Sequence, residues 1–218
     1  AAAINEGFNL ATGSILCWIN SDDMYMPGVF RKIAGYFTNE SAPILVFGNC
    51  IHFNNESGKA RGSNVPRCHG RYRLSLCDYV IQPSSFWNRS AWTLTGHLNE
   101  GMHFAFDWDW FIRAQQASVK FIPVEEYLSL YRIHAQHKSG NGGNKRVEEL
   151  KTIVSTYNDP RLAQAFNKWM QIYGKDNFVS KSIDGSERFD LSFLNTLFRW
   201  SLFPSLDRNE FQSIVAMK

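Results

Sequence analysis

The stretch from residue 14 to residue 23 reads Ser14-Ile15-Leu16-Cys17-Trp18-Ile19-Asn20-Ser21-Asp22-Asp23. Its first part is apolar and aromatic without a helical break, which is typical of a buried strand. The run then ends abruptly in a serine and two adjacent carboxylates. Ligand sites in open α/β sheets lie outside the carboxyl ends of strands. Two neighbouring carboxylates at such a place repel each other unless a positive group lies between them and a ligand.

Two interpretations of Ser21, Asp22 and Asp23 are open from the residues alone. Carboxylates suit a hard divalent cation, and Mg²⁺ or Mn²⁺ is usually held by one or two of them together with substrate phosphates. The alternative is a helix cap, because Ser and Asp commonly precede a helix. Pro27 suits the first turn of a helix that we expect to run through about Thr38.

Strand-like and helix-like segments alternate in the first part of the chain, and only helix-like segments follow the glycine-rich break at residues 140–143. The expected strands cover residues 43–53, 81–87, 119–122 and 127–133. The expected helices cover residues 4–11, 27–38, 74–80, 90–95, 107–117, 144–157, 160–173 and 189–202. This order predicts an α/β domain over residues 1–139 and a helical extension over residues 140–218.

A second polar cluster is Asp107-Trp108-Asp109, at the start of an expected helix. One of the two acids could act as a general base, with a pKa tuned by its apolar neighbours. The alternative is structural. Acids stabilise the start of a helix through its dipole, and Asp109 can pair with Arg113 one turn later.

A third cluster follows the expected strand at residues 127–133 and reads Tyr131-Arg132-Ile133-His134-Ala135-Gln136-His137-Lys138. Strand alternation sends Arg132 and His134 to the same face. A histidine and two cations at a strand end could bind a metal or a diphosphate. An ordinary basic strand end is the alternative.

The bulk composition narrows the class of protein. Hydrophobic residues make up 44% of the chain and charged residues 20%, which fits a globular protein. The net charge of +3 is too weak to argue for nucleic acid as a partner. The four cysteines form no CxxC pair, and two lie in apolar runs, so we expect a reducing, cytoplasmic setting. No apolar run approaches the roughly 18 residues of a membrane span.

Taken in order, several motifs resemble glycosyltransferase family 2 over roughly residues 1–139. They are Ala3-Ile4-Asn5-Glu6-Gly7, Ala11-Thr12-Gly13, Trp18-Ile19-Asn20-Ser21-Asp22-Asp23, Pro27-Gly28, Gln82-Pro83-Ser84, Asp107-Trp108-Asp109-Trp110, Arg113 and Tyr131-Arg132-Ile133-His134. The resemblance implies a GT-A fold, which is a mixed sheet flanked by helices, and transfer with inversion at the anomeric carbon. It also implies a nucleotide-sugar donor and an acceptor, either a saccharide or a lipid-linked molecule.

The resemblance also implies roles for individual residues. Asp22 and Asp23 correspond to the acidic motif that holds Mn²⁺ or Mg²⁺ against the diphosphate of the donor, with Asp23 expected as the more direct ligand. Asp107 falls at the catalytic base, although Phe106 replaces the usual preceding acid and Asp109 is the alternative base. His134 matches a position that contacts the metal or the diphosphate. Candidate substrate-binding residues are Ser21, Gln82, Trp108, Arg132 and Lys138.

Several questions are left open by the resemblance. The family normally opens with a strand, a helix and a second strand that hold the nucleobase, and we expect these to lie before Ala1. The alternative functions are a metal-dependent nucleotidyl- or phosphotransferase, and a non-catalytic module. The helical extension is expected to pack on the catalytic domain. The alternative is that it docks on a partner or on a membrane surface, which would be the inner face of the membrane.

Overall fold

The computed structural model describes residues 1–37, 42–136, 142–173, 200 and 203–216. The chain divides into two compact units, of which the first comprises residues 1–69 and 79–134 and the second comprises residues 70–78 and 135–218. Each unit is described by itself. The sequence-based boundary between residues 139 and 140 stays a prediction, and residues 70–78 group with the helical unit.

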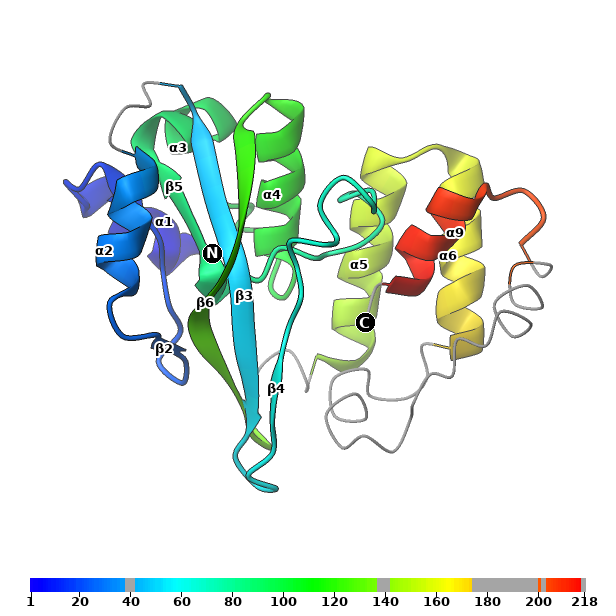
Figure 1. Cartoon of the computed structure of the whole chain (residues 1–218). Coiled ribbons are helices and arrows are strands. Elements are labelled where there is room, and N and C mark those ends of the chain that lie inside the picture. Colours follow the sequence, from blue (N-terminus) through cyan, green and yellow to red (C-terminus); the bar gives the residue numbers. More distant parts are fainter. Residues whose placement is uncertain (38–41, 137–141, 174–199, 201–202, 217–218) are drawn as a thin grey trace. The chain divides into compact units, whose positions relative to one another are not determined.

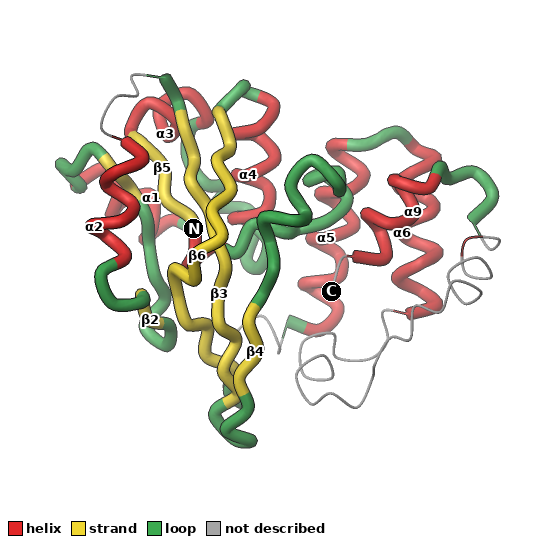
Figure 2. Tube along the Cα trace, in the orientation of Figure 1, coloured by secondary structure: helices red, strands yellow, loops and turns green. Residues whose placement is uncertain are grey.

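The first unit is built on a mixed sheet in the order β1-β5-β3-β6-β2, with β4 paired to β3 (Figure 1). The strands are β1 (Ile15–Leu16), β2 (Met24–Tyr25), β3 (Ile44–Asn54), β4 (Ala60–Gly62), β5 (Ser85–Asn88) and β6 (Lys120–Ile133). Only the β3–β6 pair is parallel among the strands of this sheet. Figure 2 shows these two long strands side by side, with β4 along one end of β3. The expected mixed α/β architecture is therefore confirmed.

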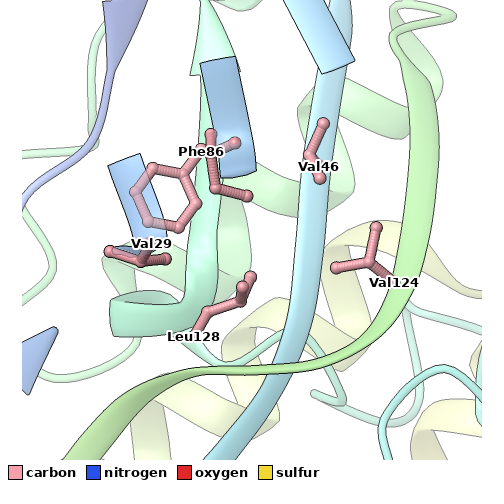
Figure 3. Close-up of a cluster of buried hydrophobic side chains, with 6 residues drawn as sticks. Val29, Val46, Phe86, Val124 and Leu128 are labelled. Atoms are coloured by element: carbon pink, nitrogen blue, oxygen red, sulfur yellow. The ribbon is translucent and has the colours of Figure 1, made fainter. Parts of the chain in front are cut away.

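Helices cover both faces of this sheet, and two adjacent residues of β5 show how. Phe86 packs in a buried cluster with Val29 and Ile33 of α2 (Val29–Ala34) and with Val46 of β3 (Figure 3). Trp87 instead contacts Phe8 of α1 (Ala2–Leu10) and Trp110 of α4 (Phe106–Gln116). Because neighbouring side chains of a strand point to opposite faces, α2 covers one face and α1 and α4 cover the other.

The remaining short elements of the first unit agree with the turn chemistry of the sequence. Helix α3 (Arg89–Thr95) is capped by the Asn88 side chain, whose Oδ1 accepts the N–H of Ala91 at 3.0 Å. It ends at Gly96, whose φ of 82° suits glycine. Two 3₁₀ turns, η1 (Gly35–Phe37) and η2 (Gln82–Ser84), complete the unit.

The strand expected before the acidic turn is shorter than the sequence suggests. Only Ile15 and Leu16 pair with β5. The carbonyl oxygen of Trp18 accepts hydrogen bonds from the Gln82 side chain and the Tyr25 hydroxyl in place of a ladder partner. The ladder ends at the pair Leu16–Trp87, although β5 itself extends to Ser85 and pairs there with β3.

Two other expectations for the first unit are corrected. The strands expected at residues 119–122 and 127–133 are one strand, β6, which pairs with β3 through register shifts near Asn49. The helix expected from Pro27 begins at Val29, because Gly28 has a φ of 75° and lies in a turn. Its expected end at Thr38 lies outside the described residues.

The second unit contains α5 (Gly143–Tyr157), α6 (Pro160–Tyr173) and α9 (Arg208–Ala216). The first two confirm the helices expected at residues 144–157 and 160–173. The helix expected at residues 189–202 lies outside the described residues except for Trp200. Residues 74–80 form a turn at 74–76 followed by irregular structure instead of the expected helix. No helix in the described part of the chain is both long and apolar enough to cross a membrane.

A buried carboxylate organises the start of α9. Asp207 and Glu210 form a reciprocal capping box, in which each side chain accepts the backbone N–H of the other residue, at 3.0 Å and 2.8 Å. The guanidinium of Arg161 also donates to both oxygens of Glu210 at 2.8 Å. These bonds hold the pKa of Glu210 at about 2, chiefly through Arg161.

Candidate active site

The acidic turn is positioned by the short strand that follows it. Met24 pairs with Leu130 and Tyr25 with Ser129, so β2 lies antiparallel to the end of β6. The residues just before β2 therefore meet the residues just after Leu130. The backbone N–H of Arg132 donates to Oδ1 of Asp23 at 3.0 Å, which locks the turn to the strand end.

Asp22 and His134 meet at this junction. Nε2 of His134 lies 3.0 Å from Oδ2 of Asp22. The side chain of Asp22 is 34% exposed and that of His134 is 28% exposed, so both groups remain within reach of a ligand. A carboxylate oxygen and an imidazole nitrogen are both metal ligands in proteins.

Asp23 has a different environment from its neighbour. It is 8% exposed, and the Asn20 amide donates to its Oδ2 at 3.3 Å while Arg132 binds the other oxygen. Burial raises the pKa of Asp23 above its ordinary value, and the hydrogen bond from Arg132 opposes that rise. The structure therefore makes Asp22 the accessible acid of the pair, whereas Asp23 stabilises the turn. The expectation that Asp23 is the more direct ligand stays a prediction.

The fit of a divalent cation depends on donors beyond the protein. Among residues 1–37, 42–136, 142–173 and 203–216, no three His, Cys, Asp or Glu side chains gather into a metal cluster. Asp22 and His134 supply two donors. A cation such as Mg²⁺ or Mn²⁺ often takes only one or two protein ligands and completes its shell with water and substrate phosphate oxygens. The residues present fit a cation of that kind.

Gln82 holds the backbone that leads into the acidic turn. It is buried in η2, and its Nε2 donates to the carbonyl oxygen of Trp18 at 2.6 Å. The Tyr25 hydroxyl donates to the same oxygen at 3.1 Å. Gln82 was expected to bind substrate, and the structure places its amide nitrogen in this internal bond.

Asp107 lies in the first turn of α4 and is half-buried. Its Oδ1 accepts the backbone N–H of Trp108 at 2.9 Å. The preceding residue, Phe106, has its ring 6.3 Å from the ring of Trp18. That contact brings the start of α4 to the segment that joins β1 to the acidic turn.

The other two residues of the second cluster face the interior. Asp109 is 4% exposed, and its Oδ2 accepts the Nε–H of Arg113 at 2.9 Å. Arg113 also donates to the carbonyl oxygens of Thr95 and His97, so the ion pair ties α4 to the end of α3. Trp108 has no exposed surface, and its ring belongs to the core.

The remaining candidates differ in accessibility. Ser21 is exposed beside Asp22. Arg132 is also exposed, and its Nε donates to Oδ1 of Asn55 at 3.2 Å. Lys138 lies outside the described residues. The structure thus brings Ser21, Asp22, Arg132 and His134 to one strand end.

Two serines that the sequence did not single out lie beneath this junction. The hydroxyls of Ser84 in η2 and Ser129 in β6 are 2.6 Å apart, and Ser84 also donates to the carbonyl oxygen of Asn49 at 2.8 Å. Both side chains are fully buried. They connect η2, which contains Gln82, to β3 at Asn49 and to β6, whose end leads to His134. The signal available in the sequence was a pair of polar residues inside apolar, strand-like runs.

Comparison with known proteins identifies a family over the first part of the chain. The family model described as glycosyl transferase family 2 matches residues 1–98 of the chain. No curated protein matches the chain. The matched segment contains the acidic turn, Gln82 and Asn5.

Proposed function

We propose that this chain belongs to glycosyl transferase family 2, whose model matches residues 1–98, and that it transfers a sugar with inversion from a nucleotide-sugar donor to an acceptor hydroxyl. The family match supports glycosyltransferase activity in general.

The donor diphosphate is proposed to lie at the junction of β2 and β6. Asp22 and His134 would hold Mn²⁺ or Mg²⁺, and a bound cation would offset the charge that develops on the leaving diphosphate. The exposed guanidinium of Arg132, on the same strand end, suits a phosphate oxygen. Ser21 is exposed next to Asp22 and offers a hydroxyl to the same ligand.

Asp107 is the proposed general base. In a direct displacement, the acceptor oxygen attacks the anomeric carbon while the bond from that carbon to the diphosphate oxygen breaks. Asp107 takes the proton of the acceptor hydroxyl, and the nucleoside diphosphate leaves with the bonding electrons. Of the two acids in α4, Asp107 suits this role, because Asp109 is buried and paired with Arg113.

The observation that carries the proposal is the approach of Asp22 and His134 to 3.0 Å, across 112 residues of sequence. Neither residue is needed to fill the core, because each side chain is about one-third exposed. An acid and an imidazole that meet at the end of a buried strand suit a ligand with an anionic group and a cation.

The acceptor is proposed to be a saccharide or a lipid-linked molecule of a surface polysaccharide or glycoconjugate. A cytoplasmic setting is proposed on the cysteines, since Cys17, Cys50, Cys68 and Cys77 form no disulfide with one another. A vesicle-binding experiment would detect docking of the helical unit on a membrane surface.

A transfer assay tests the proposal. The protein is incubated with Mn²⁺, a panel of UDP-, GDP- and dTDP-sugars, and oligosaccharide acceptors, and the products are separated. We expect release of the nucleoside diphosphate together with a new glycosidic bond whose anomeric configuration is opposite to that of the donor. Retained configuration, or a product in which the nucleotide stays attached to the acceptor, contradicts the proposal and favours another transferase reaction.

A further inference from the structure

Asn5 is a buried amide in α1 that the active site does not use directly. It belongs to the motif Ala3-Ile4-Asn5-Glu6-Gly7, and it is 3% exposed. Its Nδ2 donates to the carbonyl oxygen of Leu98 at 3.0 Å, and its Oδ1 accepts the N–H of Leu98 at 2.9 Å. The amide thus pairs with both backbone groups of one residue, as a neighbouring strand would.

A third bond extends this contact. Nδ2 of Asn5 also donates to Oε1 of Glu100 at 2.8 Å. The segment at residues 98–100 has no regular secondary structure, and Leu98 itself is buried. Buried backbone groups need partners, and for Leu98 the side chain of Asn5 supplies both of them.

The residues just before this segment are held from the other side. Trp110 of α4 donates its Nε1–H to the carbonyl oxygen of Gly96 at 2.8 Å. Arg113 donates to the carbonyl oxygens of Thr95 and His97. Residues 95–100 are therefore clamped between α1 and α4, and the chain from residue 101 to residue 106 runs from this clamp to Asp107.

We propose that Asn5 is a positioning residue that fixes the segment at residues 98–106, and through it the acceptor side of the site at Asp107. This inference rests on the proposed function for its link to the acceptor. The chemistry suits an amide, because its oxygen accepts one hydrogen bond while its NH₂ group donates two from the same planar group. An aspartate at position 5 would keep the acceptor for Leu98 but lose the donors and face Glu100.

The chain offers a matched control in Asn88. It is likewise a buried amide with three hydrogen bonds, to the carbonyl oxygen of Ala42 and from the N–H groups of Ile44 and Ala91. Those bonds hold β5 and α3 and do not involve residues 98–106. The variants Asn5→Ala and Asn88→Ala therefore remove comparable bonding at two different places.

The first measurement is amide hydrogen exchange. In Asn5→Ala we expect exchange of the amides in residues 98–104 to rise by about 10-fold or more, which corresponds to about 1.4 kcal/mol of lost protection. In Asn88→Ala the exchange of that segment stays unchanged. Glu100→Ala removes one bond from an exposed residue, so this variant folds even where Asn5→Ala does not, and it gives a smaller rise of about 2- to 3-fold.

The second measurement separates positioning from stability. With Mn²⁺ and the best donor of the panel, Asn5→Ala should lower transfer to the acceptor by about 10-fold relative to hydrolysis of the donor, with the KM for the donor unchanged. Asn88→Ala should leave that ratio at the wild-type value. Equal ratios in the two variants, or unchanged exchange of residues 98–104 in both Asn5→Ala and Glu100→Ala, would overturn the inference.

The two measurements also separate this inference from the proposed function. Exchange is measured without donor or acceptor. Suppose that exchange of residues 98–104 rises in Asn5→Ala but the wild-type protein transfers no sugar. Asn5 would then still hold this segment, while its link to the acceptor and the proposed function would both be overturned. Unchanged exchange in a protein that transfers sugar would overturn the role of Asn5 alone.

Discussion

Nε2 of His134 lies 3.0 Å from Oδ2 of Asp22 although 112 residues separate them in sequence. The approach depends on a strand of two residues, because the pairing of Met24 with Leu130 and of Tyr25 with Ser129 sets the register of the turn against β6. A shift by one residue would send these side chains to the opposite face. The site therefore depends on backbone pairing as much as on the two side chains.

The variant Asp107→Asn should slow sugar transfer by about 10²- to 10⁴-fold, the usual contribution of a general base. Donor binding should remain close to wild type, because the amide keeps the shape of the carboxyl group. Initial rates and donor titrations measure the two effects separately. Normal turnover in the variant would remove Asp107 from the mechanism.

The variant Asp109→Asn tests the neighbouring acid. It breaks the buried ion pair with Arg113, so we expect a loss of about 2 kcal/mol in the free energy of unfolding. Turnover of the folded protein should change little. Urea unfolding and initial rates at 25 °C check the two parts. Intact stability with abolished turnover would instead make Asp109 the base.

The hydroxyl pair of Ser84 and Ser129 should couple energetically. Each change to alanine removes a bond in a fully buried place and should cost about 1 kcal/mol. Because both variants remove the same bond, the double variant should cost less than the sum, by about 0.5 kcal/mol or more. Urea unfolding of the wild type, the two single variants and the double variant gives the free energies for this double-mutant cycle. Strict additivity would show that the two hydroxyls do not act as a pair.

Glu210 should make the helical unit sensitive to acid. Its pKa in the folded state is about 2, below the ordinary value of 4.5, so its contribution to stability is complete above about 4.5 and disappears as the pH falls toward 2. Glu210→Gln should lower the unfolding free energy by about 2 kcal/mol at pH 7. The difference from wild type should shrink between pH 4.5 and pH 2. A difference that does not depend on pH would contradict this assignment.

Much of the fold could be predicted from local patterns. Apolar spacing predicted α1, α5 and α6. Patterns of this kind report on burial within one segment. They could not show that residues 120–133 form one strand, because the register shifts near Asn49 interrupt its alternation.

The site was predictable as a set of positions but not as an arrangement. Sequence spacing cannot show that Asp22 turns toward His134 while Asp23 turns inward, since the two acids are adjacent and chemically alike. Nor does an aromatic residue between two acids reveal that Trp108 is fully buried. These differences arise from long-range pairing of β2 with β6 and from packing of α4.

Calorimetric titration of the protein with nucleotide sugars, with and without Mn²⁺, tests the central claim most directly. We expect at least one UDP-, GDP- or dTDP-sugar to bind in the presence of Mn²⁺, and to bind at least about 10-fold more weakly when Asp22 is changed to Ala. The variant Glu56→Gln, at the exposed hairpin turn, serves as the control and should bind like the wild type. Binding that is equally tight in Asp22→Ala, or no binding of any donor to the wild type, would contradict the account.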